Sequence, residues 1–340
     1  MNYDKNYVEE KARQYSIRAE MYEKQERLLD ILENIRNDPV LNCTLALKGG
    51  TAINLFVMEG PRLSMDIDLD YAQDCSKEEM LKDRKLINSK LQNIFEKGGY
   101  ILRTDNRISH ILDSLKIEYQ NINNRRDYLK MDINYLDRCH ILPIKEKGIK
   151  APWAERNLSV NCVDEIEIFA TKMVALCTRA KARDLYDVVQ LKEKLNLNKF
   201  EKDMLHKCIV FYSAIGTTNI KESLQLSRIN DISQYDLKTQ VLPLALEKHF
   251  ICLDELRSKA DEFINEMHIL TYDDERFIDN FQNGYYKPEQ LFDGNQLENI
   301  LNHPMALYKT EKYRQKTMET IESECLREQY KGKEGPELGD

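Results

Sequence analysis

The sequence predicts an α+β protein in which a mixed sheet with flanking helices is followed by an all-helical lobe. Segments of alternating polar and apolar residues, typical of half-buried strands, end near residue 136, and helical spacing dominates from about residue 164 to residue 308. We expect a first domain over residues 1–158, a helical domain over 159–308 and a polar, frayed tail over 309–340.

Composition narrows the class of protein. A chain of 340 residues is long enough for two domains, and its formal net charge of −8 gives no general attraction to nucleic acid, so any such contact needs a local basic patch. No apolar run approaches the roughly 20 residues of a membrane span, and the N-terminus lacks the apolar core of a signal peptide. Eight dispersed cysteines without a CxxC pair argue against zinc and predict a reduced, cytoplasmic protein with no membrane partner.

The front of the chain predicts helices and strands in alternation. Residues 4–36 have helical apolar spacing that ends at Asn37–Asp38–Pro39, and Ser76 with Glu79 forms a capping box for a helix over residues 76–97. The other expected elements are strands at 40–47, 62–70, 100–103, 115–120 and 128–136, a short helix at 51–58, a loop at 145–152 and a helix at 164–192.

Residues 62–70 alternate without interruption between polar and apolar side chains. The apolar set enters a core, and the opposite face carries Arg62, Ser64, Asp66, Asp68 and Asp70. Three carboxylates on one strand face repel each other, and an ordinary solvated strand does not favour Asp. A bound divalent cation is the usual compensation, so we expect Asp66 and Asp68 to hold metal. Asp70 would lie behind them or at the rim, and Arg62 or Ser64 could orient Asp66.

Just upstream, Lys48-Gly49-Gly50-Thr51 places a glycine pair before the expected short helix. Glycine pairs are usually tight turns, but a turn of this kind can also cradle phosphate. Lys48 could meet either a phosphate or a carboxylate. A phosphate turn followed by an Asp-x-Asp strand indicates metal-dependent phosphoryl or nucleotidyl transfer.

A second alternating segment, residues 130–135, places Asp132 opposite Met131, Ile133 and Tyr135. Two metals roughly 4 Å apart can activate the attacking oxygen and steady the leaving one, and a carboxylate from a neighbouring strand completes such a site. We therefore expect Asp66, Asp68 and Asp132 to converge, although a strand Asp can also lie on a solvated face.

A basic stripe is expected on the helix over residues 164–192. Lys172, Arg179 and Arg183 lie at i, i+7 and i+11, which places each arginine within about 20° of Lys172 on a continuous helix. A cationic stripe facing an acidic metal site suits a triphosphate. The alternative is a surface stripe supported by an ion pair between Arg183 and Asp187.

Three motifs together resemble the AbiEii toxin family, nucleotidyltransferase-like proteins of type IV toxin–antitoxin and phage-defence systems. The motifs, which lie within about residues 48–187, are Lys48-Gly49-Gly50-Thr51-Ala52, Arg62-x-Ser64-x-Asp66-Ile67-Asp68 and Lys172 with Arg183-Asp184-Leu185-Tyr186-Asp187. The resemblance implies a DNA polymerase β-like nucleotidyltransferase fold, an NTP substrate, Mg²⁺ or Mn²⁺, and a cognate antitoxin. In characterised members of the family the acceptor is the 3′ end of tRNA, which blocks translation.

Carried over by motif, the resemblance implies that Gly50 and Thr51 touch phosphates, Asp66 and Asp68 hold metal, and Lys172 contacts the nucleotide. Asp184 would be a catalytic or orienting residue. The superfamily pattern has Gly-Ser where this chain has Gly50-Thr51, which keeps the hydroxyl and adds a methyl group.

Two alternative functions remain open. The same chemistry supports nucleotidylation of a protein or of a small molecule, and the fold could also serve a catalytically silent binding protein, although the intact carboxylate trio argues against silence. If the acceptor is RNA, it needs cations other than the NTP stripe. The loops around the Asp132 strand offer Arg125, Arg126, Lys145, Lys147 and Lys150.

Overall fold

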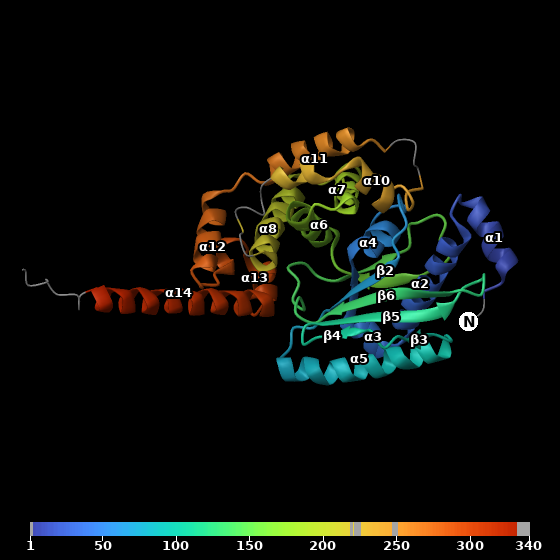
Figure 1. Cartoon of the computed structure of the whole chain (residues 1–340), viewed down its shortest axis with the longest axis horizontal. Coiled ribbons are helices and arrows are strands. Elements are labelled where there is room, and N and C mark those ends of the chain that lie inside the picture. Colours follow the sequence, from blue (N-terminus) through green and yellow to red (C-terminus); the bar gives the residue numbers. More distant parts are fainter. Residues whose placement is uncertain (1–2, 218–219, 221–225, 247–250, 332–340) are drawn as a thin grey trace, which may run out of the picture.

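A computed structural model describes residues 3–217, 220, 226–246 and 251–331, and its centre is an eight-stranded mixed sheet (Figure 1). The strand order is β3-β5-β6-β2-β1-β8-β7, with β4 paired to β5. The strands are β1 Leu45–Lys48, β2 Asp66–Tyr71, β3 Ile101–Leu102, β4 Arg107–Ile108, β5 Leu112–Gln120, β6 Arg126–Asn134, β7 Lys145–Gly148 and β8 Ser159–Cys162. The predicted α+β class is confirmed.

Helices cover both faces of this sheet. Figure 1 shows α5 on one side and the helices α6, α7 and α8 on the other. The helical elements are α1 Lys5–Gln14, α2 Ala19–Asn37, α3 Pro39–Thr44, α4 Gly49–Ala52, the π-helix η1 Ile53–Val57, α5 Lys77–Lys97, α6 Glu165–Arg179, α7 Ala182–Lys194, α8 Lys199–Gly216, the short 3₁₀ segments η2 Leu226–Asp231 and η4 Pro288–Gln290, α10 Gln234–Gln240, α11 Leu253–Met267, α12 Tyr272–Gln282, α13 Gly294–Ile300 and α14 Pro304–Lys331.

The acidic strand lies near the middle of the sheet. β2 runs antiparallel to β1 and parallel to β6. Ile67 and Leu69 are buried on the face that α5 covers, where Arg84 of α5 also forms an ion pair with Asp113 of β5. The carboxylates of the alternating pattern therefore lie on the opposite face, toward α6.

The capping box predicted for residues 76–97 is confirmed. The Ser76 hydroxyl accepts from the Glu79 backbone N–H, and Glu79 accepts in return from the Ser76 backbone N–H. Each end of α5 is thus set by local sequence, with Gly98 at its C-terminus.

The strand expected at residues 40–47 is only partly right. The Asp38 side chain accepts hydrogen bonds from the backbone N–H groups of Val40 and Leu41, and Pro39 occupies the first turn, so residues 39–44 form the helix α3. Proline lacks the N–H that a first helical turn leaves unpaired anyway. Only Leu45–Lys48 continues as a strand.

The loop expected at residues 145–152 is wrong over its first half. Lys145–Gly148 forms the edge strand β7, which pairs with β8, and β8 pairs in turn with β1. Charged side chains on an edge strand protect it from further pairing, and they also conceal its alternation in the sequence. Because β8 spans Ser159–Cys162, the sheet extends past the domain boundary expected after residue 158.

Two expected helices are each divided by a residue that is not glycine but has a positive φ. Ala180 (φ 46°) separates α6 from α7 within the expected helix 164–192, and Ser16 (φ 55°) lies between α1 and α2. Neither break carries the Gly or Pro that usually marks one in a sequence.

The polar tail expected from residue 309 is helical as far as Lys331, because α14 continues through it. In Figure 1 this helix projects away from the rest of the molecule. Residues 332–340 of the expected tail lie outside the described residues. Among the helices that the structure describes, none has the length and apolar character needed to cross a membrane.

Candidate active site

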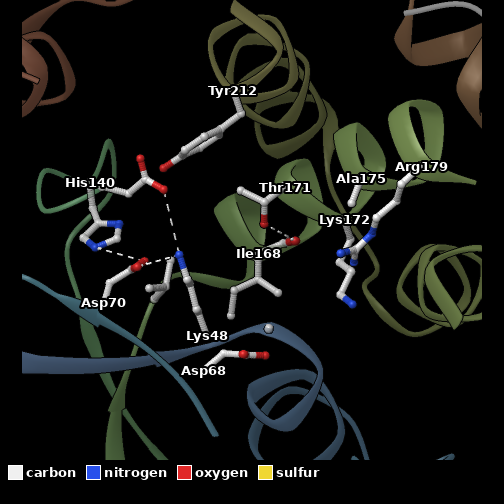
Figure 2. Close-up of a pocket in the computed structure, with 13 residues that line it drawn as sticks. Lys48, Asp68, Asp70, His140, Ile168, Thr171, Lys172, Ala175, Arg179 and Tyr212 are labelled. Carbon is white, nitrogen blue, oxygen red and sulfur yellow. Dashed lines mark hydrogen bonds and ion pairs between the residues drawn. The ribbon is translucent and has the colours of Figure 1, made fainter. Parts of the chain in front are cut away.

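A pocket of about 200 Å³ lies between the acidic face of the sheet and helix α6 (Figure 2). The sheet contributes Asp68 and Asp70 from β2 with Lys48 at the end of β1, and α6 contributes Lys172 and Arg179. The remaining lining residues are Gly49, Asp137, His140, Val163, Ile168, Thr171, Ala175 and Tyr212.

The sheet register brings the three predicted carboxylates to one face. In the parallel pair of β2 and β6, Asp68 lies directly opposite Asp132, and Asp66 lies opposite Lys130. Side chains of directly paired residues share a face, and residues two apart on one strand do as well. Asp66, Asp68 and Asp132 therefore share a face, which the expected convergence on a metal site requires but which does not by itself establish it.

The Asp132 side chain nevertheless interacts with residues other than Asp66 and Asp68. Its carboxylate accepts a hydrogen bond from the Ser114 hydroxyl at 2.6 Å and is paired with the Lys130 ammonium. Within the described ranges, no group of three or more His, Cys, Asp or Glu side chains is arranged to hold a metal ion. The trio thus shares a face without forming a three-carboxylate cluster.

The surroundings of Asp68 disfavour its negative charge. Burial raises its pKa, and the neighbouring carboxylates of Asp66 and Asp132 raise the pKa further, against the opposing effect of Lys48 and Lys172. Gly49 allows the close approach: its φ is 71°, and a Cβ at this position would collide with Oδ2 of Asp68. The site is therefore short of positive charge next to Asp68.

Lys48 meets carboxylates, which was one of the two partners expected for it. Its ammonium lies 2.5 Å from Oδ1 of Asp70 and 4.0 Å from Oδ2 of Asp137. Asp70 lies on the same strand face, deep in the pocket, with only 2% of its surface exposed, and burial raises its pKa to about 6 in spite of Lys48 and His140. Figure 2 shows Lys48 pointing away from Lys172 and toward this buried group.

The polar pocket residues His140 and Tyr212, and Glu167 which contacts both of them, were not predicted. His140 lies between two carboxylates, with Nε2 3.8 Å from Asp70 and Nδ1 3.8 Å from Glu167. Glu167 is fully buried and accepts hydrogen bonds from the Tyr212 hydroxyl and from the backbone N–H of Leu142. These residues come from separate elements, and no spacing in the sequence connects them.

Lys172, Arg179 and Asp184 are brought together. Asp184 is buried and accepts from Lys172 at 3.1 Å and from Nε of Arg179 at 2.7 Å. Lys172 also lies 3.0 Å from Asp187. Both cations remain among the residues that line the pocket.

Arg183 does not belong to this group. The break at Ala180 places it on α7, where it is exposed and outside the pocket, so the continuous three-residue stripe is wrong. The expected ion pair with Asp187 is also wrong, because Asp187 is paired with Arg62 and Lys172. Arg62 accordingly turns into the interior and does not orient Asp66.

The glycine turn is packed tightly against the segment that precedes β2. The Thr51 hydroxyl donates to the backbone carbonyl of Asp66, and Thr51 is buried. A Cβ on Gly50 would lie 2.8 Å from the Ser64 hydroxyl oxygen. The turn therefore fixes the position of the acidic strand, whatever else it binds.

A mixed sheet that sets an Asp-x-Asp strand beside a glycine turn, facing a helix with cations, is the architecture of a nucleotidyltransferase. The chain belongs to the AbiEii family: the family model described as "Nucleotidyl transferase AbiEii toxin, Type IV TA system" matches residues 30–267. It is thus a nucleotidyltransferase of a toxin–antitoxin family.

A solved structure shares this fold. It is MenT4, the nucleotidyltransferase toxin Rv2826c from Mycobacterium tuberculosis H37Rv, with a TM-score of 0.59 and 18% sequence identity. The match covers 90% of this chain and 99% of the MenT4 chain. A comparison with curated proteins gave no significant match.

Proposed function

We propose that this protein transfers a nucleoside monophosphate from an NTP to RNA, with release of pyrophosphate and with the 3′ end of tRNA as the acceptor, and thereby blocks translation in the cytoplasm. One observation carries the proposal: across a single pocket, Asp68 lies opposite the cations Lys172 and Arg179, and Asp66 shares the strand face of Asp68. A nucleotide triphosphate needs both, because metal ions neutralise only part of its charge. Membership of a type IV toxin–antitoxin family implies a cognate antitoxin as partner.

The chemistry of the donors fits a hard divalent cation. Carboxylate oxygens are the ligands of Mg²⁺ and Mn²⁺, and the raised pKa of Asp68 marks a place where added positive charge is favourable. Asp66 and Asp68 would hold the ion, and Asp132 is the third candidate, neutralised by Lys130 in this structure. When bound, the ion would polarise the phosphoryl oxygens and activate the attacking hydroxyl.

The protein side chains would supply binding and orientation. Lys172 and Arg179 would contact the phosphates, and Asp184 would hold both in place through its bonds to them. Gly49 lets the backbone approach close to Asp68, and we include Gly50 and Thr51 in the phosphate-binding turn, which begins after Lys48, itself paired with Asp70. Thr51 would act through its backbone, because its hydroxyl is already bonded to Asp66.

The test is transfer of label from each radiolabelled NTP in turn, with Mg²⁺ and total RNA, compared between the wild type and Asp68→Asn. We expect label on RNA of tRNA size with one or more NTPs and none with the variant. The variant should remain folded, since removing one of several clustered carboxylates relieves repulsion. Label on a protein or a small molecule alone would reject the RNA acceptor, and no label on any acceptor would reject the transfer reaction.

A further inference from the structure

The sheet face that carries the acidic site continues into a basic and aromatic surface. On β6, Tyr128, Lys130 and Asp132 follow one another at intervals of two residues and therefore share a face. Lys130 lies opposite Asp66 on one side and opposite Lys116 of β5 on the other. Figure 1 shows β2, β6 and β5 side by side below the helical lobe.

Tyr128 is surrounded by cations from three different elements. Lys24 of α2 lies 5.3 Å from the centre of its ring, Arg103 beyond β3 lies 5.6 Å away, and Lys116 of β5 lies 5.9 Å away. Tyr128 is 39% exposed. We call Lys24, Arg103, Lys116, Arg126 and Tyr128 the Tyr128 surface.

The carboxylates around this surface do not fully balance its charge. Asp127 pairs with Lys24, and Asp105 is shared between Arg103 and Lys116. Glu118 serves both Arg103 and Arg126, at 4.0 and 3.7 Å. Asp105 and Glu118 are thus shared among three cations, Arg103, Lys116 and Arg126, so an additional anion would be bound favourably.

The positions expected for the acceptor cations do not form a single patch. Lys145 and Lys147 lie on β7, at the far edge of the sheet from β5, and each is paired with a carboxylate of the 164–165 segment. Lys150 donates to the Val57 carbonyl. Of the five, Arg126 belongs to the Tyr128 surface, and Arg125 precedes it at the β5–β6 turn.

We propose that the Tyr128 surface binds an unpaired strand of the RNA acceptor, with one base stacked on Tyr128 and the flanking phosphates on the surrounding cations. This rests on the proposed function for the identity of the acceptor. An exposed aromatic ring with cations around it is the usual means of binding single-stranded nucleic acid, because every base can stack. A duplex could not use the ring, since its bases are already stacked on each other.

The geometry connects this surface to the reaction. Tyr128 and Asp132 are four residues apart on one strand, a separation of about 13 Å along the sheet. A few nucleotides bound from Tyr128 past Lys130 would bring the end of the strand to Asp66 and Asp68. The surface would thereby select acceptors that have an unpaired end.

The experiment measures binding of a short, fluorescently labelled single-stranded RNA by anisotropy, without NTP, so that it does not depend on transfer. We expect Tyr128→Ala to weaken binding by about five- to a hundredfold, and Tyr128→Phe to bind like the wild type because it keeps the stacking face. Tyr235→Ala, at a tyrosine on α10 that is 74% exposed, is the matched control and should bind normally. Thermal unfolding of each variant verifies the fold.

The phosphate contacts are measured by the salt dependence of binding. Arg103→Ala and Lys116→Ala should each reduce the slope of log affinity against log salt by about 0.7. Equal affinity of Tyr128→Ala and the wild type, or equal binding of duplex RNA, would overturn the proposal. RNA binding that depends on Tyr128, without label transfer from any NTP, would retain this surface and reject the proposed function.

Discussion

Arg62 and Asp187 form a bidentate ion pair across 125 residues of sequence. Nε and Nη2 of Arg62 donate to the two carboxylate oxygens of Asp187, each at 2.7 Å, and both side chains are buried. Burial by itself raises the pKa of Asp187, but Arg62 and Lys172 outweigh it, so the pKa is lowered. The pair thus connects the segment that precedes the acidic strand β2 with helix α7.

Breaking this pair should destabilise the fold strongly. Arg62→Ala leaves Asp187 with less compensation in the interior, and loss of one partner of a buried pair costs about 3–5 kcal/mol. The free energy of unfolding from urea titration is the measurement. Lys202→Ala, which removes one side of the exposed pair with Glu266, is the control and should cost less than about 1 kcal/mol. A similar small loss in Arg62→Ala would contradict the structural role.

Lys172→Ala should weaken NTP use and also lower stability. Loss of one charge-assisted phosphate contact corresponds to roughly 1.5–3 kcal/mol, or about a ten- to hundredfold rise in KM for the NTP. Stability falls as well, because Lys172 is a partner of two buried carboxylates, Asp184 and Asp187. Steady-state kinetics and urea unfolding separate the two effects.

Arg183→Ala is the matched control for Lys172, since Arg183 is a nearby cation that is exposed and outside the pocket. We expect its KM for NTP and its stability to stay close to the wild type. A rise in KM comparable to that of Lys172→Ala would show that Arg183 binds the nucleotide after all.

Gly49→Ala should impair transfer by displacing Asp68. The backbone at Gly49 has φ 71°, a conformation that costs other residues of order 1–2 kcal/mol, and the added Cβ collides with the Asp68 carboxylate. Gly148→Ala provides the comparison, because a Cβ there has no neighbour within 4 Å. The transfer rate and melting temperature of Gly49→Ala should both be clearly lower than those of Gly148→Ala. Equal transfer rates in the two variants would show that Gly49 is not needed to position Asp68.

Asp70→Asn should change the pH dependence of stability in a defined direction. Burial raises the pKa of Asp70 from 3.8 to about 6, while Lys48 and His140 lower it and Asp137 raises it. The folded state therefore holds more protons than the unfolded state between these pH values, and the stability that Asp70 contributes is lost as pH rises through this window.

Asn at position 70 does not titrate. The free energy of unfolding of the variant minus that of the wild type should therefore increase by up to about 3 kcal/mol as the pH is raised from about 4 to about 7. Urea unfolding of both proteins at the two pH values measures the difference. Asp273→Asn, at an exposed carboxylate on α12, controls for loss of charge alone and should show no such gain. If the difference in free energy of unfolding between the wild type and Asp70→Asn were the same at both pH values, Asp70 would not have a raised pKa in the folded state.

The features that the sequence predicted well depend on short-range patterns. Alternation over residues 62–70 assigned Asp66 and Asp68 to the face opposite Ile67 and Leu69, and the structure has this arrangement from Asp66 onward. The Ser76–Glu79 capping box set the start of α5 in the same way. Both are decided by residues within one or two turns or pleats of each other, so no distant contact could change them.

Several of the expected elements were wrong for one of two reasons. Either a local pattern was outweighed by another interaction, or the sequence carried no local signal at all. Residues 40–44 are apolar enough for a strand, yet the cap from Asp38 makes them helical. The edge strand β7 is too charged to alternate, and Ala180 ends α6 without a glycine. In each case the backbone follows hydrogen bonds that hydrophobic periodicity does not describe.

By itself, the sequence determined the acidic strand, the glycine turn and the family, because these are contiguous motifs. Only the tertiary structure decided which charges meet: Arg62 with Asp187, Lys48 with Asp70, Lys172 with Asp184, and Tyr128 with its three cations. The physical reason is that a buried charge must find an opposite charge wherever the fold supplies one. That partner comes from the packing of elements distant in the chain, and no local pattern specifies it.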